Sequence, residues 1–211
     1  MKPSSWNNVR NMYEANADSY AEMMDKEIDL PVYKDLLGRL HENISDIPGA
    51  LLDTACGSGH MLAMFRSNYD SNRSVIGIDI SPRMVEIAKT LIGEEGSVVV
   101  GEMRALPNIS SGSVAAVINF FAIHHLDIDD IRESMLEWYR VLVHSGHLLL
   151  AAWEGNGAID YGEESDIVAL RYSSNELIEI AESVGFIVNR CLVVPVEGFP
   201  MDAIYLECMK Q

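Results

Sequence analysis

Short apolar runs alternate along the chain with longer amphipathic stretches. The apolar runs cover residues 51–53, 74–80, 98–100, 113–119 and 146–153. Stretches with apolar side chains every three or four residues occur between them, for example at 61–69 and 127–143. Apolar runs of this length indicate strands buried on both faces, and the amphipathic stretches indicate helices that cover those faces. The pattern predicts an α/β fold with a doubly wound, mainly parallel sheet.

The carboxyl-terminal part of the chain breaks this alternation. Ser173 and Glu176 have the spacing of a capping box, and Gly185 is placed to end the helix that they begin. Two further strands are predicted at 186–194 and 203–208, with only a short segment containing Pro195, Gly198 and Pro200 between them. Parallel neighbours need a long crossover, so these two strands are expected to form a terminal antiparallel hairpin.

The amino-terminal region has helical spacing from Trp6 to Leu40, and Pro31 divides it into two segments. One face of the first segment carries Tyr13, Asn16, Ala17, Tyr20 and Met23. The simplest interpretation is an amphipathic helix that covers an edge of the sheet.

Composition narrows the classes of partner. A length of 211 residues suits one α/β domain, so a single domain over 1–211 is expected. The formal net charge of −17 disfavours nucleic acid, because a phosphate backbone would be repelled. The sequence has no apolar run near the roughly 20 residues of a membrane span and no leader pattern. The three cysteines lack metal-ligand spacing, which favours a cytoplasmic protein with reduced thiols and no metal site.

The segment after the first strand carries the clearest binding signal. It reads Asp53-Thr54-Ala55-Cys56-Gly57-Ser58-Gly59, and it opens into an amphipathic helix. Glycine lets a ligand lie against the backbone, and the helix start favours an anion, so a nucleotide-like ligand is implied. Leu62 stands where a dinucleotide-binding loop has its third glycine, which argues against NAD or FAD. Cys56 is interpreted as a small residue in a tight turn and not as a nucleophile.

An acid, small residues and a G-x-G pair in this order resemble the first motif of the class I S-adenosylmethionine-dependent methyltransferases, with Ala55 where that family usually has glycine. The resemblance extends over roughly residues 13–210. It implies a seven-stranded sheet in the order 3-2-1-4-5-7-6 and S-adenosylmethionine as cofactor. It also implies that residues 1–45 form a helical lid on the substrate side, since the family often has a Tyr-rich segment like Tyr13–Tyr20.

Several residues follow as candidate cofactor contacts. Asp79 ends the second strand and is placed to accept hydrogen bonds from both ribose hydroxyls, and Asp53 suits a cationic amine. The resemblance places Glu102 at the exocyclic amine of adenine and Met103 over the ring. The full candidate set is Tyr20, Asp53, Ala55, Cys56, Gly57, Gly59, Asp79, Ile80, Met84, Glu102, Met103 and Asn119.

The substrate side is less well defined by the sequence. His124 and His125 follow the fourth strand, and either would suit a general base. His124 is the first candidate and Tyr161 the second. The alternative is that the two histidines only pack and form structural hydrogen bonds. Substrate contacts are expected from Tyr13, Trp153 and Arg171, because ligands of open α/β sheets bind at the carboxyl ends of the strands. The sequence shows no inserted cap domain, which favours a small-molecule substrate. The protein is expected to be a monomer or a homodimer.

The expected reaction is in-line transfer of a methyl group from the sulfonium to an oxygen or nitrogen of that substrate. Two alternatives stay open. One is an NAD-dependent oxidoreductase, disfavoured by Leu62 and the terminal hairpin. The other is a protein of the same fold that binds S-adenosylmethionine without catalysis.

Overall fold

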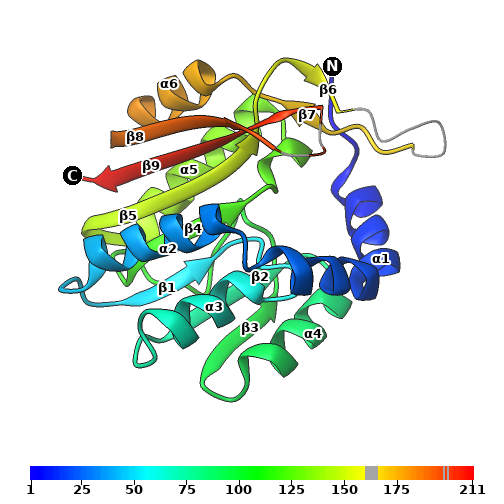
Figure 1. Cartoon of the computed structure of the whole chain (residues 1–211). Coiled ribbons are helices and arrows are strands. Elements are labelled where there is room, and N and C mark those ends of the chain that lie inside the picture. Colours follow the sequence, from blue (N-terminus) through cyan, green and yellow to red (C-terminus); the bar gives the residue numbers. More distant parts are fainter. Residues whose placement is uncertain (160–165, 197, 199) are drawn as a thin grey trace.

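A single sheet of seven strands organises the chain in the computed structural model, which describes residues 1–159, 166–196, 198 and 200–211 (Figure 1). The strands are β1 Ala50–Asp53, β2 Val75–Asp79, β3 Gly96–Val100, β4 Val114–Phe120, β5 Leu142–Trp153, β8 Phe186–Pro195 and β9 Asp202–Lys210, in the spatial order β3-β2-β1-β4-β5-β9-β8. β1 to β5 are parallel, and β9 runs antiparallel between β5 and β8. The predicted strand order and terminal hairpin are confirmed.

The helices cover both faces of this sheet. They are α1 Trp6–Glu27, α2 Pro31–Ile44, α3 His60–Asn68, α4 Pro82–Ile92, α5 Ile128–Val141 and α6 Ser174–Val184, with a 3₁₀ turn, η1, at Ile123–His125. Figure 1 shows α2, α3 and α4 in front of the sheet and α5 and α6 behind it. Pro31 and Pro82 both stand at the start of a helix, where a missing N–H costs nothing. The predicted capping box of Ser173 and Glu176 is present.

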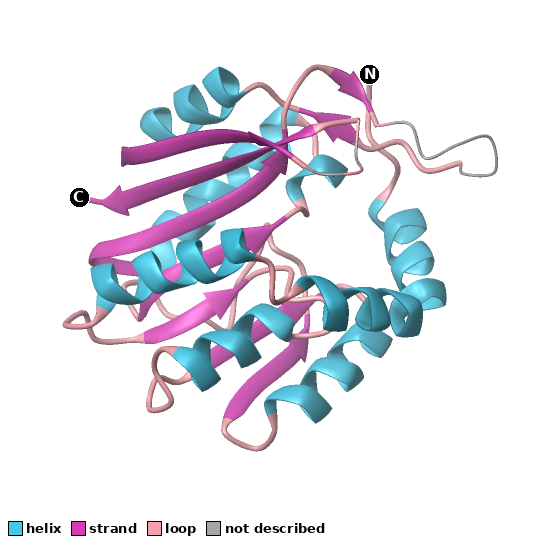
Figure 2. Cartoon of the chain, in the orientation of Figure 1, coloured by secondary structure: helices cyan, strands magenta, loops and turns pink. Residues whose placement is uncertain are grey.

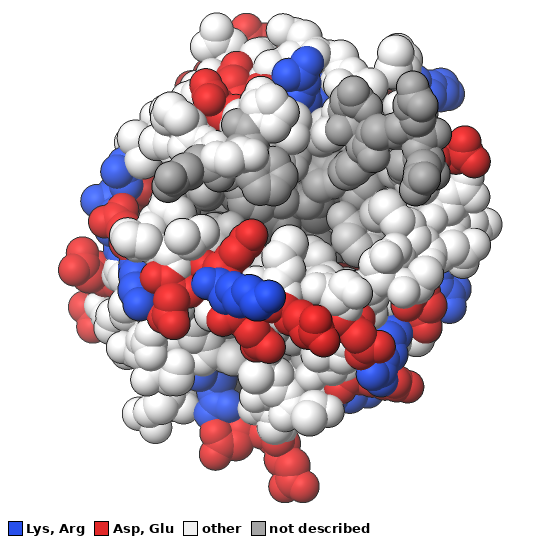
Figure 3. All heavy atoms as spheres, turned by 45° about the vertical axis from the view of Figure 1, so that its right-hand side comes forward, with Lys and Arg blue, Asp and Glu red and all other residues white. Residues whose placement is uncertain are grey.

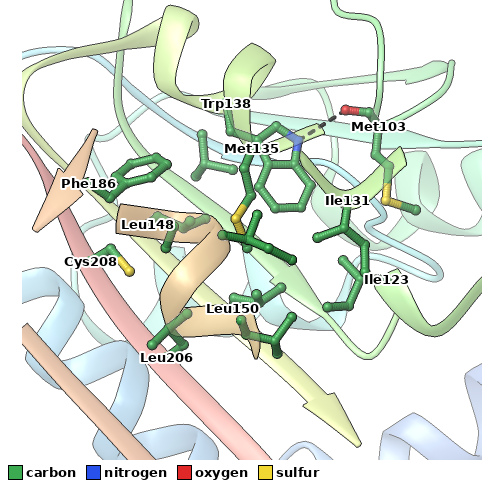
Figure 4. Packing of buried hydrophobic residues seen from close by; sticks show 14 of the residues in the cluster. Met103, Ile123, Ile131, Met135, Trp138, Leu148, Leu150, Phe186, Leu206 and Cys208 are labelled. Atoms are coloured by element: carbon green, nitrogen blue, oxygen red, sulfur yellow. Dashed lines mark hydrogen bonds between the residues drawn. The ribbon is translucent and has the colours of Figure 1, made fainter. Parts of the chain in front are cut away.

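Two hydrophobic clusters, one on each face, hold the helices to the sheet. Successive residues of β5 alternate between them: Leu148 and Leu150 belong to the cluster under α5 and α6, and Leu149 and Ala151 to the cluster under α2, α3 and α4. This is the period of two that a strand imposes on its side chains. Figure 4 shows the first cluster, where the fully buried Trp138 donates its indole N–H to the carbonyl of Met103 at 3.0 Å.

Two local features differ from the sequence prediction. The sequence predicted a helix that ends at Val143 and a strand that begins at Gly146. In the structure α5 ends at Val141 and β5 begins at the next residue, Leu142, so the predicted connection is part of the strand. Leu142 pairs with Val114, and the register between β4 and β5 shifts after that pair. A ribbon of two short strands, β6 Gly157–Ala158 and β7 Leu170–Arg171, was not predicted. Strands of two residues are too short to show a hydrophobic period.

α1 stands away from the sheet face, beside the carboxyl ends of the parallel strands (Figure 2). Its leading residues are tied to the far part of the chain, because the Ser4 N–H donates to the Val168 carbonyl and the Val168 N–H donates to Ser4 Oγ, both at 2.8 Å. No helix in the described ranges combines the length and the apolar character needed to cross a bilayer. The carboxyl edge of the sheet and α1 together enclose the site described next.

Candidate active site

The loop between β1 and α3 forms the floor of a cavity of about 720 Å³. Gly57 (φ 49°) and Gly59 (φ 88°) have left-handed backbone conformations, which disfavour residues with a side chain. A Cβ on Gly57 would lie 3.2 Å from the Tyr20 ring, whereas a Cβ on Gly59 would lie 3.0 Å from the Cβ of Ala88 on α4. Gly57 therefore faces the cavity, and Gly59 serves the packing of two helices.

Asp79, at the carboxyl end of β2, is the cavity's central carboxylate. Its Oδ2 accepts the Gly57 N–H at 2.8 Å and its Oδ1 accepts the Ser81 N–H at 2.9 Å. Burial raises the pKa of Asp79, and the backbone hydrogen bonds from Ser81 and Gly57 oppose that rise. A carboxylate has about four acceptor positions, so these two contacts leave acceptor capacity for a ligand in the cavity.

Asp53 faces a second, smaller cavity of about 380 Å³, which shares Tyr20 and Ala55 with the first. The Ala55 N–H donates to its Oδ1 at 3.1 Å. Burial, with a smaller effect from the charge of Asp79, raises the pKa of Asp53 to about 7. Cys56 lines the same small cavity, and burial raises the pKa of its free thiol well above the usual value, which confers no nucleophile character.

Tyr20 lies between the two cavities and over Gly57. Burial and the neighbouring carboxylates of Asp79 and Asp53 raise the pKa of its phenol. Four further residues of the candidate set, Ile80, Met84, Glu102 and Met103, also line the larger cavity. The Glu102 carboxylate accepts a hydrogen bond from Arg104, which also donates to Asp130 at 2.8 Å.

Asn119 lies behind the cavity wall. Its side chain is fully buried and donates to Thr54 Oγ1 at 3.0 Å, with a longer contact of 3.6 Å to the Met103 sulfur. Thr54 and Met103 line the cavity and Asn119 does not. This geometry gives Asn119 the role of holding two lining residues in place.

α1 forms the outer wall and is attached to two helix starts. Glu14 accepts hydrogen bonds from Ser81 Oγ at 2.6 Å and from the Arg83 N–H at 3.1 Å. Arg83 donates in turn to Asp18 at 2.7 Å. Further along α1, Asp25 Oδ1 lies 2.9 Å from Nε2 of His60, whose Nδ1 contacts Ser58 Oγ at 2.8 Å.

The opposite end of the cavity is aromatic. Phe121 has a positive φ of 49°, an unfavourable conformation for a bulky residue, and such strain is concentrated at functional sites. It directs the chain into η1, where His125 lines the cavity and contacts Tyr13: Oη and Nε2 are 3.0 Å apart. His124 is buried against the His125 ring, and neither of its ring nitrogens has a hydrogen-bond partner among the described residues.

The remaining substrate candidates are placed outside the cavity. Trp153 packs on Phe121 with ring centroids 4.5 Å apart, and Arg171 lies against Gly155 and donates to the Asn156 carbonyl at 2.9 Å. Neither is among the described residues that line the cavity. Tyr161 falls outside the described residues. In the described ranges no three His, Cys, Asp or Glu side chains converge as metal ligands.

Several lining residues were not predicted. Trp6, Val9, Phe121, Ala122 and Leu126 all contribute to the aromatic end. Trp6, Val9 and Tyr13 recur at three- and four-residue spacing, so a shared helical face was detectable in the sequence. Nothing in the sequence indicated that this face turns toward a cavity.

Part of this chain is similar in sequence to known proteins. Residues 51–146 match the family model of a methyltransferase domain. A dTDP-4-amino-2,3,4,6-tetradeoxy-D-glucose N,N-dimethyltransferase of Saccharopolyspora spinosa is 30% identical over 104 residues, 49% of this chain and 40% of that protein. An uncharacterised methyltransferase of Bacillus licheniformis is 25% identical over 120 residues, 57% of this chain and 54% of that protein. This chain thus spans about half the length of these curated relatives or less.

The fold is shared with solved structures over almost the whole chain. A Burkholderia thailandensis 1,6-didemethyltoxoflavin-N1-methyltransferase, solved with 1,6-didemethyltoxoflavin and S-adenosylhomocysteine, superimposes with a TM-score of 0.76 at 16% identity. The match covers 97% of this chain and 88% of that one.

Proposed function

We propose that this chain is a class I S-adenosylmethionine-dependent methyltransferase and that it transfers the methyl group of S-adenosylmethionine to an oxygen or nitrogen atom of a small molecule. The match to the methyltransferase-domain model, which extends from β1 into β5, supports this proposal.

The observation that carries this proposal is the pairing of Gly57 with Asp79. Gly57 lines the cavity, a Cβ there would come within 3.2 Å of the Tyr20 ring, and the Asp79 carboxylate is held beside Gly57 by two backbone N–H groups. A nucleoside needs both features: a close approach to the backbone and a fixed acceptor for two ribose hydroxyls. The residues present therefore fit S-adenosylmethionine.

Each wall of the site has a separate task. When bound, S-adenosylmethionine supplies a methyl group on a cationic sulfur, and the carbon–sulfur bond breaks as the acceptor atom bonds to carbon, with the electron pair going to sulfur. Asp79 would hold the ribose, Glu102 and Met103 the adenine, and Asp53 the amine of the methionine part. The aromatic end would align the acceptor, and α1 would exclude water and act as the lid.

A small-molecule acceptor is supported by the lining of the cavity and by charge. The cavity is lined mainly by apolar and aromatic side chains with a few polar groups among them, as sites for small ligands are. On the face shown in Figure 3, Lys and Arg side chains are scattered among Asp and Glu side chains, in keeping with the net charge of −17. A polyanionic acceptor such as nucleic acid would meet repulsion.

The alternative of an NAD-dependent oxidoreductase receives no support from the site. Leu62 is fully buried on α3 where a dinucleotide fold has glycine, and β9 is inserted antiparallel beside β5. We set that alternative aside.

Calorimetric titration with S-adenosylmethionine and S-adenosylhomocysteine tests the proposal. Asp79→Ala should weaken both by about 1.5–3 kcal/mol, roughly tenfold or more, because it removes a charged acceptor from the ribose. Asp46→Asn, an exposed acid beyond α2, is the matched control and should bind normally. Unchanged affinity in a folded Asp79→Ala protein, or retention of NADH in place of S-adenosylmethionine, would overturn the assignment.

A further inference from the structure

Tyr13 and His125 form a hydrogen-bonded pair at the aromatic end of the cavity. Their Oη and Nε2 atoms are 3.0 Å apart, and their rings meet edge to face with centroids separated by 5.5 Å. Tyr13 comes from α1 and His125 from η1, so the contact joins residues 112 positions apart in the sequence. Both side chains line the cavity.

Tyr13 holds the ring nitrogen of His125 that has a hydrogen-bond partner in the described part of the chain. The Nδ1 atom of His125 is buried with no hydrogen-bond partner among the described residues, whereas Nε2 contacts the Tyr13 hydroxyl. If Tyr13 donates its proton to Nε2, its oxygen becomes the acceptor that an acidic hydrogen in the cavity meets first. His124 cannot substitute, because it is buried behind His125.

The imidazole is uncharged near neutral pH. Burial lowers the pKa of His125 to about 4, so it can take up a proton during a reaction but carries none beforehand. Among the described residues, the titratable side chains in contact with it are Tyr13 from α1 and His124 from its own turn. The Tyr20 ring in turn meets the Tyr13 ring edge to face at a centroid separation of 6.2 Å, and Asp79 and Glu102 line the same cavity.

The rest of this end of the cavity is apolar. Trp6, Val9, Phe121, Ala122 and Leu126 complete the lining, and Trp6 at the rim is 48% exposed. None of the described residues that line either cavity is Lys or Arg. An acceptor with a carboxylate or phosphate would therefore be desolvated without a partner, while an uncharged flat ring would cover Trp6 and Phe121.

We propose that Tyr13 and His125 act as one proton-accepting pair, and that the acceptor is a hydroxyl group on an uncharged aromatic or unsaturated ring. As the acceptor oxygen gains the methyl carbon, its proton goes to Tyr13 Oη and the Tyr13 proton goes to His125 Nε2. The net charge balances, since the positive charge of the sulfonium ends on the imidazolium. The inference rests on the proposed methyl transfer and narrows it to oxygen.

The test uses the whole chain with methyl-labelled S-adenosylmethionine and a series of ring-substituted phenols of graded acidity. Tyr13→Phe and His125→Gln should each lower kcat about 100-fold or more, with little change in KM or in S-adenosylhomocysteine affinity. The double variant should be no slower than either single variant, because the two residues act as a unit. Tyr139→Phe and His144→Gln make the same chemical changes away from the cavity and should leave the rate unchanged.

Varying the acidity of the phenol distinguishes a role of Tyr13 and His125 in proton transfer from a purely structural role. The deficit of Tyr13→Phe and His125→Gln should shrink as the phenol becomes more acidic or as the pH passes its pKa, because an ionised acceptor needs no base. If the losses in kcat of the two single variants add up in the double variant and do not depend on the acidity of the phenol, the proposal that Tyr13 and His125 act as one proton-accepting pair is wrong. Faster methylation of benzoates or anilines than of phenols, or no binding and no methylation of any phenol, would overturn the acceptor class. If the wild-type chain does not bind S-adenosylmethionine, the proposed function itself is wrong.

Discussion

At the scale of single residues, Asp53 is the carboxyl group whose protonation we expect to respond to ligand binding. It is almost fully buried and lacks a cationic partner among the described residues, and its pKa is raised to about 7 by burial and by the charge of Asp79. A carboxyl whose folded-state pKa exceeds its ordinary value of 3.8 stabilises the unbound protein fully below about pH 4. That contribution is lost as the pH rises through about 7.

Ligand binding should depend on pH in the opposite direction. The ammonium group of S-adenosylmethionine needs an ionised Asp53, so we expect affinity to rise between pH 5 and about 7, by up to about tenfold per pH unit. Calorimetry across this range measures it. Asp53→Asn should flatten the profile, whereas Asp46→Asn should keep it; an affinity that is constant with pH in the wild-type protein would contradict the role of Asp53.

The sequence did not predict which of the two adjacent histidines, His124 or His125, lines the cavity. His124 and His125 are adjacent and chemically identical, and the sequence offered either as a base, with His124 as the candidate. In the structure, the left-handed conformation of Phe121 and the turn of η1 direct His125 to the cavity and bury His124. Side-chain direction within an irregular turn has no period from which it can be read.

At the scale of elements, α1 is linked to α4 by polar contacts at the surface of the molecule. Its polar links to α4 run through Glu14 and Asp18, and those side chains are exposed. Exposed ion pairs contribute little and are screened by salt. Links of this kind would suit the proposed role of α1 as a lid, because they would hold a closed position without preventing opening.

We expect the combined substitution of Glu14→Gln and Asp18→Asn to speed amide hydrogen exchange in α1 and the release of S-adenosylhomocysteine. Exchange mass spectrometry and stopped-flow release measure the two effects. Glu86→Gln is the matched control, since Glu86 pairs with the same Arg83 at 3.1 Å but lies on α4 itself. Equal acceleration in the control would mean that Arg83 acts within α4 and does not hold α1.

At the scale of the whole molecule, the two-sided burial of the sheet governs stability. β4 and β5 lie at its centre, and side chains from both of their faces are buried under helices. Neither face of these strands can be altered without loss of packing, in contrast to a sheet with one solvated face.

Leu149→Ala and Leu150→Ala, which point to opposite faces, should each lower the free energy of unfolding by about 2–5 kcal/mol. Urea denaturation measures both. Val100→Ala, on edge strand β3 and 53% exposed, is the control and should change it by less than about 0.5 kcal/mol. If either substitution leaves the free energy of unfolding unchanged, the face of the sheet that carries that leucine is not tightly packed.

Local patterning was sufficient for the order of helices and strands, the antiparallel end of the sheet and the loop at Gly57, because apolar period, glycine conformation and connection length each act over a few neighbouring residues. It was not sufficient for the aromatic end of the cavity. The contact between Tyr13 and His125 joins two elements that no local signal relates, and the exclusion of Trp153 and Arg171 from the lining follows from how those side chains pack. Only the packing of α1 across the carboxyl edge of the sheet brings the residues of that end together, since free energy from burial depends on contacts distant in the sequence.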